Sequence, residues 1–277
     1  MTRKHFFERM ERENDYLKEY IKLEALCETK CNTSWESNYD TINEFIEMNF
    51  WEWKDRKNYI SFSELREEMG FAIDIGNKAR HLTATAIDMN MYFSFCEMIV
   101  TLMAAFENRI DPALKVVRNA MIETMIATIE KVGFEFRQFD REIRIVEKNA
   151  VATEIADFIP ELADTIIEYN HYMLKGNLER KRILLKYISD ALEPKRGILN
   201  GICKRNTDDF FELINTMNVR HNNLDPTDKR KYNDKFATMK PSEQEAWYDL
   251  LYEQALGLFV AIEQQERNRK IDEYKQS

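Results

Sequence analysis

Glycine and proline are scarce in this chain, with only 7 Gly and 5 Pro among 277 residues. A fold made of many strands needs a turn roughly every 8–12 residues, and turns draw heavily on these two residue types. Few turns imply long elements, which favours helices. Hydrophobic residues make up 44% of the chain and aromatic residues 12%, enough to bury a core and too many for a disordered segment. The sequence therefore predicts an all-α protein built as a multi-helix bundle.

Capping signals place several of the helices. Ser61 and Glu64 have the spacing of a capping box, and Gly70 follows as a helix stop. Asp111 precedes a proline at a first helical position, so another helix begins there. Further expectations are a first helix over 5–28, a central helix over 86–106, a helix capped by Thr207, a last helix from Pro241 with Ser242 and Glu245 as its capping box, and a frayed tail over 266–277.

One segment departs from helical periodicity. In GFEFRQFDREIRIVEKN, apolar and polar residues alternate on either side of a polar centre. This alternation predicts one small β-hairpin near residues 134–146. The hairpin marks the expected join between two domains. These are 1–132, a helical region of open role, and 133–277, the hairpin with a C-terminal helical domain.

Composition also excludes several classes of protein. No run of about 18 uncharged apolar residues occurs, and no apolar signal core follows the N-terminus. The four cysteines do not resemble a disulfide framework, which fits a reducing compartment. We therefore expect a cytoplasmic protein with no membrane contact.

Neither a metal nor a cofactor is expected. Glu168 and His171 have the Glu-x-x-His spacing of a di-metal bundle, but no second such pair occurs. Cys27 and Cys31 lack the two further ligands that a structural zinc site needs nearby. The sequence also has no phosphate-binding glycine loop and no Gly-x-Ser-x-Gly motif, which disfavours a nucleotide-binding α/β enzyme.

Charge is distributed unevenly along the chain. The net charge of −9 contains a middle block, residues 175–240, with fifteen Lys and Arg against nine Asp and Glu. A basic block in an acidic protein indicates a local anionic partner such as nucleic acid. The alternative is that the acidic and basic surfaces pair within the fold or across a dimer. The charge alone does not decide between the two.

The stretch NTMNVRHNNLDP lies in this basic block and contains the candidate site. Helix propensity falls through it, so Arg220 and His221 are expected at or just past a helix C-terminus. On a first interpretation, the two side chains only cap the terminal carbonyl groups of that helix. Alternatively, histidine is a general acid or base, and arginine binds a phosphate and stabilises its developing charge. This second interpretation assigns catalysis to these two residues and RNA or phosphate binding to Asn218, Asn222, Lys229, Arg230, Lys231 and Lys235.

Three further stretches, YNHYMLKGNLERKRILLKYISDALEP, DDFFELINTMNVRHNNLDP and WYDLLYEQALGLFVAI, follow one another over about residues 145–265. In this order they resemble the HEPN superfamily, in particular helical proteins linked to abortive infection and phage defence. The resemblance implies RNA as the partner, a homodimer, and an arginine followed by a histidine across four to six residues. Here Arg220 and His221 are adjacent instead, so they match that motif only as its nearest equivalents.

Two functional hypotheses follow. The first is a HEPN-like RNA-binding protein or metal-independent endoribonuclease that acts as a defence effector. The second is a non-enzymatic helical protein-interaction or scaffold protein that uses Arg220 as an ion-pair partner. The first predicts that His221→Ala abolishes RNA cleavage, whereas the second predicts no cleavage at any salt concentration.

Overall fold

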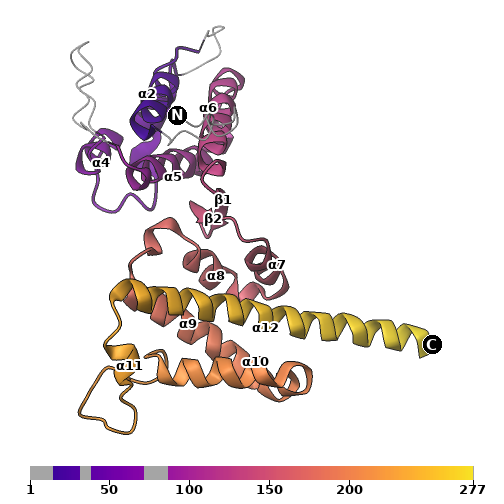
Figure 1. Ribbon diagram of the computed structural model, residues 1–277. Coiled ribbons are helices and arrows are strands. Elements are labelled where there is room, and N and C mark those ends of the chain that lie inside the picture. Colours follow the sequence, from indigo (N-terminus) through magenta and orange to yellow (C-terminus); the bar gives the residue numbers. More distant parts are fainter. Residues whose placement is uncertain (1–14, 32–38, 72–86, 277) are drawn as a thin grey trace, which may run out of the picture. The chain divides into compact units, whose positions relative to one another are not determined.

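The computed structural model describes residues 15–31, 39–71 and 87–276. The chain divides into two compact units, Met1–Ile145 and Val146–Ser277 (Figure 1). The start of the helix expected over 5–28 lies outside the described residues. Within the described residues no helix is long and apolar enough to span a membrane.

The first unit is a small helical bundle. Its longest helix pair is the apolar α5 and the amphipathic α6, and α2 packs against both. Asp111 caps α6 by accepting the N–H groups of Ala113 and Leu114, as the sequence predicts. The helices are α2 (Tyr16–Cys27), α3 (Ile42–Asn49), α4 (Phe62–Glu68), α5 (Met89–Ala105) and α6 (Pro112–Glu130), with short 3₁₀ turns η1 (Phe50–Glu52) and η2 (Glu107–Arg109).

The predicted capping box at α4 is present in altered form. The Ser61 hydroxyl accepts the N–H of Glu64 at 3.0 Å, while the Glu64 carboxylate accepts the N–H of Ile60 rather than that of Ser61. Gly70 ends the helix with φ +81°, a left-handed conformation that favours glycine. The predicted start and stop of this helix are therefore confirmed.

The predicted β-hairpin is confirmed as well. Strands β1 (Phe134–Phe139) and β2 (Glu142–Glu147) form a two-stranded sheet, and its turn contains Asp140 at φ +49°. Helix α5 supports β2 within the first unit, because Thr101 Oγ1 accepts the N–H of Ile143 at 2.9 Å. A lone hairpin is marginal in water, so this attachment to a helix is needed for its stability.

The second unit is built around α12, a long helix shown in yellow in Figure 1. Helices α7, α9 and α10 pack against α12 and bury one continuous apolar core with it. Its elements are α7 (Ala150–Phe158), η3 (Pro160–Leu162), α8 (Ala163–Tyr169), η4 (Tyr172–Leu174), α9 (Leu178–Leu192), η5 (Glu193–Lys195), α10 (Arg196–Thr216), α11 (Asp234–Ala237) and α12 (Pro241–Gln276). The mostly α-helical architecture with one small hairpin is thus confirmed.

Three local predictions in this unit are wrong. Thr207 does not start a helix; it is buried inside α10, and its hydroxyl donates to the Cys203 carbonyl at a kink. Glu245 does not form a capping box, because it accepts the N–H of Gly176 instead. The closing residues continue α12 to Gln276, supported by i,i+4 ion pairs such as Arg267–Glu263.

Candidate functional site

The candidate residues lie in the loop between α10 and α11 (Figure 1). Helix α10 ends at Thr216, and Asn218 follows with φ +60°, a left-handed conformation that asparagine tolerates. The N–H of Arg220 then donates to the Ile214 carbonyl at 3.2 Å and closes the helix end. Arg220 and His221 therefore lie just past a helix C-terminus, where the sequence places them.

Asparagines hold this loop in one conformation. The N–H of Asn218 donates to the side-chain oxygen of Asn223 at 2.8 Å, and the N–H of Asn223 donates back to the side-chain oxygen of Asn218 at 3.1 Å. Asn223 is 2% exposed, and its side-chain NH₂ donates to the Lys231 carbonyl. The N–H of Asn233 donates to the Asn223 carbonyl at 2.9 Å, which joins both ends of the loop. Asn218, a predicted RNA contact, thus has its carboxamide oxygen bound within the loop.

Arg220 faces helix α9. Its guanidinium forms ion pairs with Asp190 at 3.3 Å and with Glu193 at the adjoining 3₁₀ turn. Nη2 also donates to the Ser189 carbonyl at 3.1 Å, and Cζ lies 5.6 Å from the centre of the Phe211 ring. The Nε atom is buried and has no partner among the described residues. Both Nη atoms are occupied and Nε is covered, so this arginine is not presented to an incoming phosphate.

His221 points elsewhere. It is exposed and borders a shallow cavity of about 540 Å³, whose lining includes Thr216, His221, Arg230, Lys231, Tyr232 and Lys235. Arg220 does not line this cavity. Adjacent residues outside a helix need not share a direction, and here one faces the carboxylates of α9 while the other faces the basic cavity. The structure does not bring the two predicted catalytic side chains to one point.

The loop around the cavity carries several exposed cations. Lys229, Arg230, Lys231 and Lys235 are all exposed, and none forms an ion pair with the described residues. Three of them line the cavity, whereas Lys229 and the exposed Asn222 belong to the same loop outside the lining. Three of the six predicted binding residues, Arg230, Lys231 and Lys235, therefore line one cavity with His221.

The aspartates of the loop accept hydrogen bonds from residues two positions away in the sequence. Asp225 accepts the N–H of Thr227 at 2.9 Å and its hydroxyl at 2.6 Å, and these hydrogen bonds lower the pKa of the Asp225 carboxyl. Asp228 accepts the N–H of Arg230 at 3.2 Å, and Asp234 accepts the hydroxyl of Tyr232 at 3.2 Å. These carboxylates keep their charge, and Asp234 itself lines the cavity with Arg230, Lys231 and Lys235. Three cations against one carboxylate leave the lining with a net positive charge.

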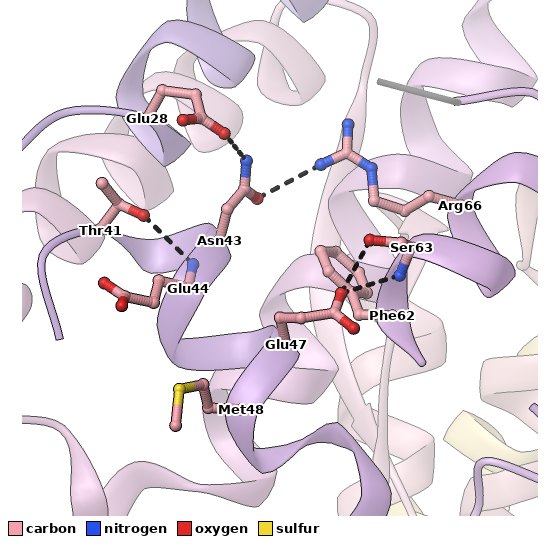
Figure 2. Close-up of a pocket in the computed structure, with 9 residues that line it drawn as sticks. All are labelled: Glu28, Thr41, Asn43, Glu44, Glu47, Met48, Phe62, Ser63 and Arg66. Carbon is pink, nitrogen blue, oxygen red and sulfur yellow. Dashed lines mark hydrogen bonds between the residues drawn. The ribbon is translucent and has the colours of Figure 1, made fainter. Parts of the chain in front are cut away.

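A second hollow, of about 240 Å³, lies in the first unit between α2, α3 and α4 (Figure 2). Asn43 donates to the carboxylate of Glu28 and accepts from Arg66 at 3.2 Å. Glu47 accepts both the N–H and the hydroxyl of Ser63, each at 2.9 Å. These polar groups join the three helices to one another. We therefore regard this hollow as part of the scaffold of the first unit.

Arg66 lines that hollow, and its side chain is buried. It forms a buried ion pair with Glu24, which additionally accepts the hydroxyl of Tyr20. Burial raises the pKa of Glu24 even though Arg66 opposes this shift, and burial likewise raises the pKa of Tyr20. An ion pair this deep stabilises the packing of α2 against α4 only while both partners are present.

The other candidate chemistry from the sequence has structural partners. Glu168 forms an ion pair with Arg180 at 2.5 Å, and His171 lies in a β-bridge to Val146. The Cys27 thiol is buried 3.6 Å from the sulfur of Met121. Among the described residues, no group of three or more His, Cys, Asp or Glu side chains is arranged to hold a metal ion.

Sequence reasoning missed two groups at the site. Tyr232 lines the cavity, but a single tyrosine between basic residues gave no periodic signal. Asp190 and Glu193, the partners of Arg220, lie about 30 residues upstream in another helix. The end of α9 and the end of α10 are brought together by tertiary packing, and no local sequence pattern predicts such a contact.

The fold and the site together define a helical protein of two units with an exposed basic loop on the second. A comparison of the chain with protein-family models finds no match, and comparisons with curated proteins and with solved structures find none either. The resemblance to the HEPN superfamily therefore stays a prediction.

Proposed function

We propose that the second unit binds RNA through its phosphate backbone at the basic cavity, without cleaving it. The observation that carries this proposal is that Arg230, Lys231 and Lys235 line one cavity with His221, and none of the three is neutralised by an ion pair with the described residues. Unpaired cations on one surface attract a polyanion and release its counterions on binding. A backbone-directed site of this kind needs no metal to bind its ligand.

Binding is a better supported function than cleavage because of Arg220. Cleavage by an arginine and a histidine requires both side chains to reach the same phosphate. Arg220 is engaged with Asp190 and Glu193, so we assign it a structural role. His221 is left as a hydrogen-bonding group at the cavity, and the proposed effector acts by holding RNA.

A second candidate function, a non-enzymatic protein-interaction module, is also favoured by the ion pairs of Arg220, which that hypothesis expects. It differs from the first in predicting no affinity for RNA at any salt concentration. The homodimer implied by the resemblance is part of our proposal, since two copies would double the number of phosphate contacts. Light scattering of the purified chain gives its mass and checks this.

The test compares two variants with the same change in net charge. One replaces Arg230, Lys231 and Lys235 by Gln, and the control replaces Arg269, Lys270 and Lys275, which are exposed at the end of α12. We expect the first triple variant to bind labelled RNA at least about tenfold more weakly at low salt, and the control to bind like the wild type. Equal affinity of the two variants would contradict the proposed site. RNA that is cleaved by the wild type and left intact by His221→Ala would contradict the absence of cleavage.

A further inference from the structure

Tyr232 differs from most tyrosines of the second unit. Tyr169, Tyr172, Tyr248 and Tyr252 are buried in the unit, whereas Tyr232 is half-buried and lines the basic cavity. Its ring does not pack against another aromatic ring among the described residues. An aromatic ring on the wall of a cationic cavity is a surface on which a planar group can stack.

The structure holds this ring in place. The hydroxyl of Tyr232 donates to Asp234 at 3.2 Å, and its N–H donates to the Asp228 carbonyl at 2.9 Å. The neighbouring Asn233 is tied to Asn223 by its N–H at 2.9 Å and to the end of α10, at the Thr216 carbonyl, by its side chain at 2.8 Å. A ring fixed at its tip and at its backbone loses little conformational freedom when a ligand stacks on it.

Cations flank the ring on both sides in the sequence. Arg230 and Lys231 precede Tyr232, Lys235 follows it, and all three line the same cavity. A nucleotide carries its base and its phosphate on one sugar, so a base that enters the cavity brings its phosphates to these cations. This combination of an aromatic platform and a basic groove is the usual requirement for binding single strands.

We infer that the cavity accepts an unpaired nucleobase stacked on Tyr232, so that the site prefers single-stranded nucleic acid to a duplex. This inference rests on the proposed function and adds a substrate class to it. In a duplex the bases are already stacked and paired, and only the backbone can reach Arg230, Lys231 and Lys235. A single strand offers both the backbone and the base.

The experiment measures fluorescence anisotropy with three labelled probes of about 12 nucleotides, a length typical of single-strand sites. The probes are a poly-uridine strand, a blunt duplex and an abasic phosphodiester strand that keeps the phosphates and lacks the bases. For the wild type, we expect the uridine strand to bind at least about fivefold more tightly than either of the other two.

Variants of Tyr232 then separate stacking from hydrogen bonding. Tyr232→Leu is expected to lose about fivefold or more in affinity for the uridine strand and nothing for the duplex or the abasic strand. Tyr232→Phe, which keeps the ring and loses the bond to Asp234, should stay within about twofold of the wild type. Tyr274→Leu, an exposed tyrosine at the far end of α12, is the matched control and should bind like the wild type.

The outcomes distinguish this inference from the proposed function. If all three probes bind the wild type equally, or Tyr232→Leu binds the uridine strand as well as the wild type does, the stacking inference is overturned. The proposed function survives that result as long as the triple variant of Arg230, Lys231 and Lys235 loses affinity for every probe. If no probe binds the wild type, both are overturned. The abasic comparison uses the wild type alone, so it decides even if Tyr232→Leu fails to fold.

Discussion

Arg220 and Glu193 form an ion pair that joins the loop after α10 to the end of α9. The same guanidinium pairs with Asp190 and donates to the Ser189 carbonyl, so it satisfies both charged and polar groups at the end of a neighbouring helix. Only 18% of the Arg220 side chain is exposed. Arg220 is therefore not part of the cavity wall that His221 lines. This pair explains why an arginine next to a histidine need not be catalytic.

Replacement of Arg220 should therefore cost stability. Arg220→Gln keeps most of the side-chain length and loses both ion pairs, and we expect the free energy of unfolding to fall by about 2 kcal/mol. Urea unfolding followed by circular dichroism measures this. Arg205→Gln is the control, because the Arg205 side chain is 93% exposed and its ion pair with Asp209 is long, at 3.7 Å. Equal stability losses in the two variants would show that Arg220 has no special structural role.

His221→Ala should lower RNA affinity and leave stability unchanged, in contrast to Arg220→Gln. The imidazole is exposed and borders the cavity, so its removal should leave the unfolding free energy unchanged. Affinity for single-stranded RNA should fall by roughly two- to tenfold, the effect of losing one typical hydrogen bond. Anisotropy and urea unfolding on the same preparation check both parts. A large stability loss with unchanged affinity would move His221 from the site to the scaffold.

Two neighbouring asparagines offer a sharp test of the loop. Asn223 is buried and bonded to Asn218 and Lys231, whereas Asn222 is exposed. Asn223→Ala leaves polar groups unpaired inside the loop and should cost about 2 kcal/mol. Hydrogen exchange of the Asn233 amide, which donates to the Asn223 carbonyl, should become faster in this variant. Asn222→Ala should change neither quantity, and faster exchange there would contradict the assignment.

A pH-dependent prediction concerns Glu245 of α12. Burial by itself raises the pKa of Glu245, but the N–H of Gly176 and the charge of Lys181 outweigh it and lower that pKa below its usual range. Because the folded-state pKa lies below the unfolded-state value of about 4.3, the stabilisation from Glu245 is present above that value. It is lost as the pH falls through the lowered folded-state pKa.

Glu245→Gln should therefore lower the free energy of unfolding by about 2 kcal/mol at neutral pH, since buried Lys181 loses one of its two carboxylates. The difference from the wild type should shrink as the pH falls below about 4. Urea unfolding at a series of pH values measures it, with the exposed Glu273→Gln as control. A difference that stays constant from pH 7 to pH 3 would contradict this role for the ion pair.

The sequence predicted the parts of the fold that depend on local signals. The cap at Asp111, the stop at Gly70 and the alternation around Asp140 each act within a few residues, and each is found in the structure. The start of α10 was misplaced because Thr207 has the residue type of a cap but lies in the core beside the kink at Cys203. Residue type alone does not show which way a side chain faces.

The site was predictable only in part for the same reason. The run from Lys229 to Lys231 stands out by charge, and His221 stands out by its rarity. The direction of Arg220 depends on the carboxylates of Asp190 and Glu193, which come from a helix packed beside it. Contacts between distant segments decide whether a cation faces a ligand or a partner in the fold.

The most direct test of the central claim is the salt dependence of RNA affinity. For single strands, the slope of log K against log salt concentration becomes shallower by about 0.7 for each phosphate contact that is lost. Replacement of Arg230, Lys231 and Lys235 by Gln should therefore reduce the steepness of the slope by about 2, whereas the same change at Arg269, Lys270 and Lys275 should leave it as in the wild type. Identical slopes for the two triple variants would contradict a phosphate-binding site at this cavity.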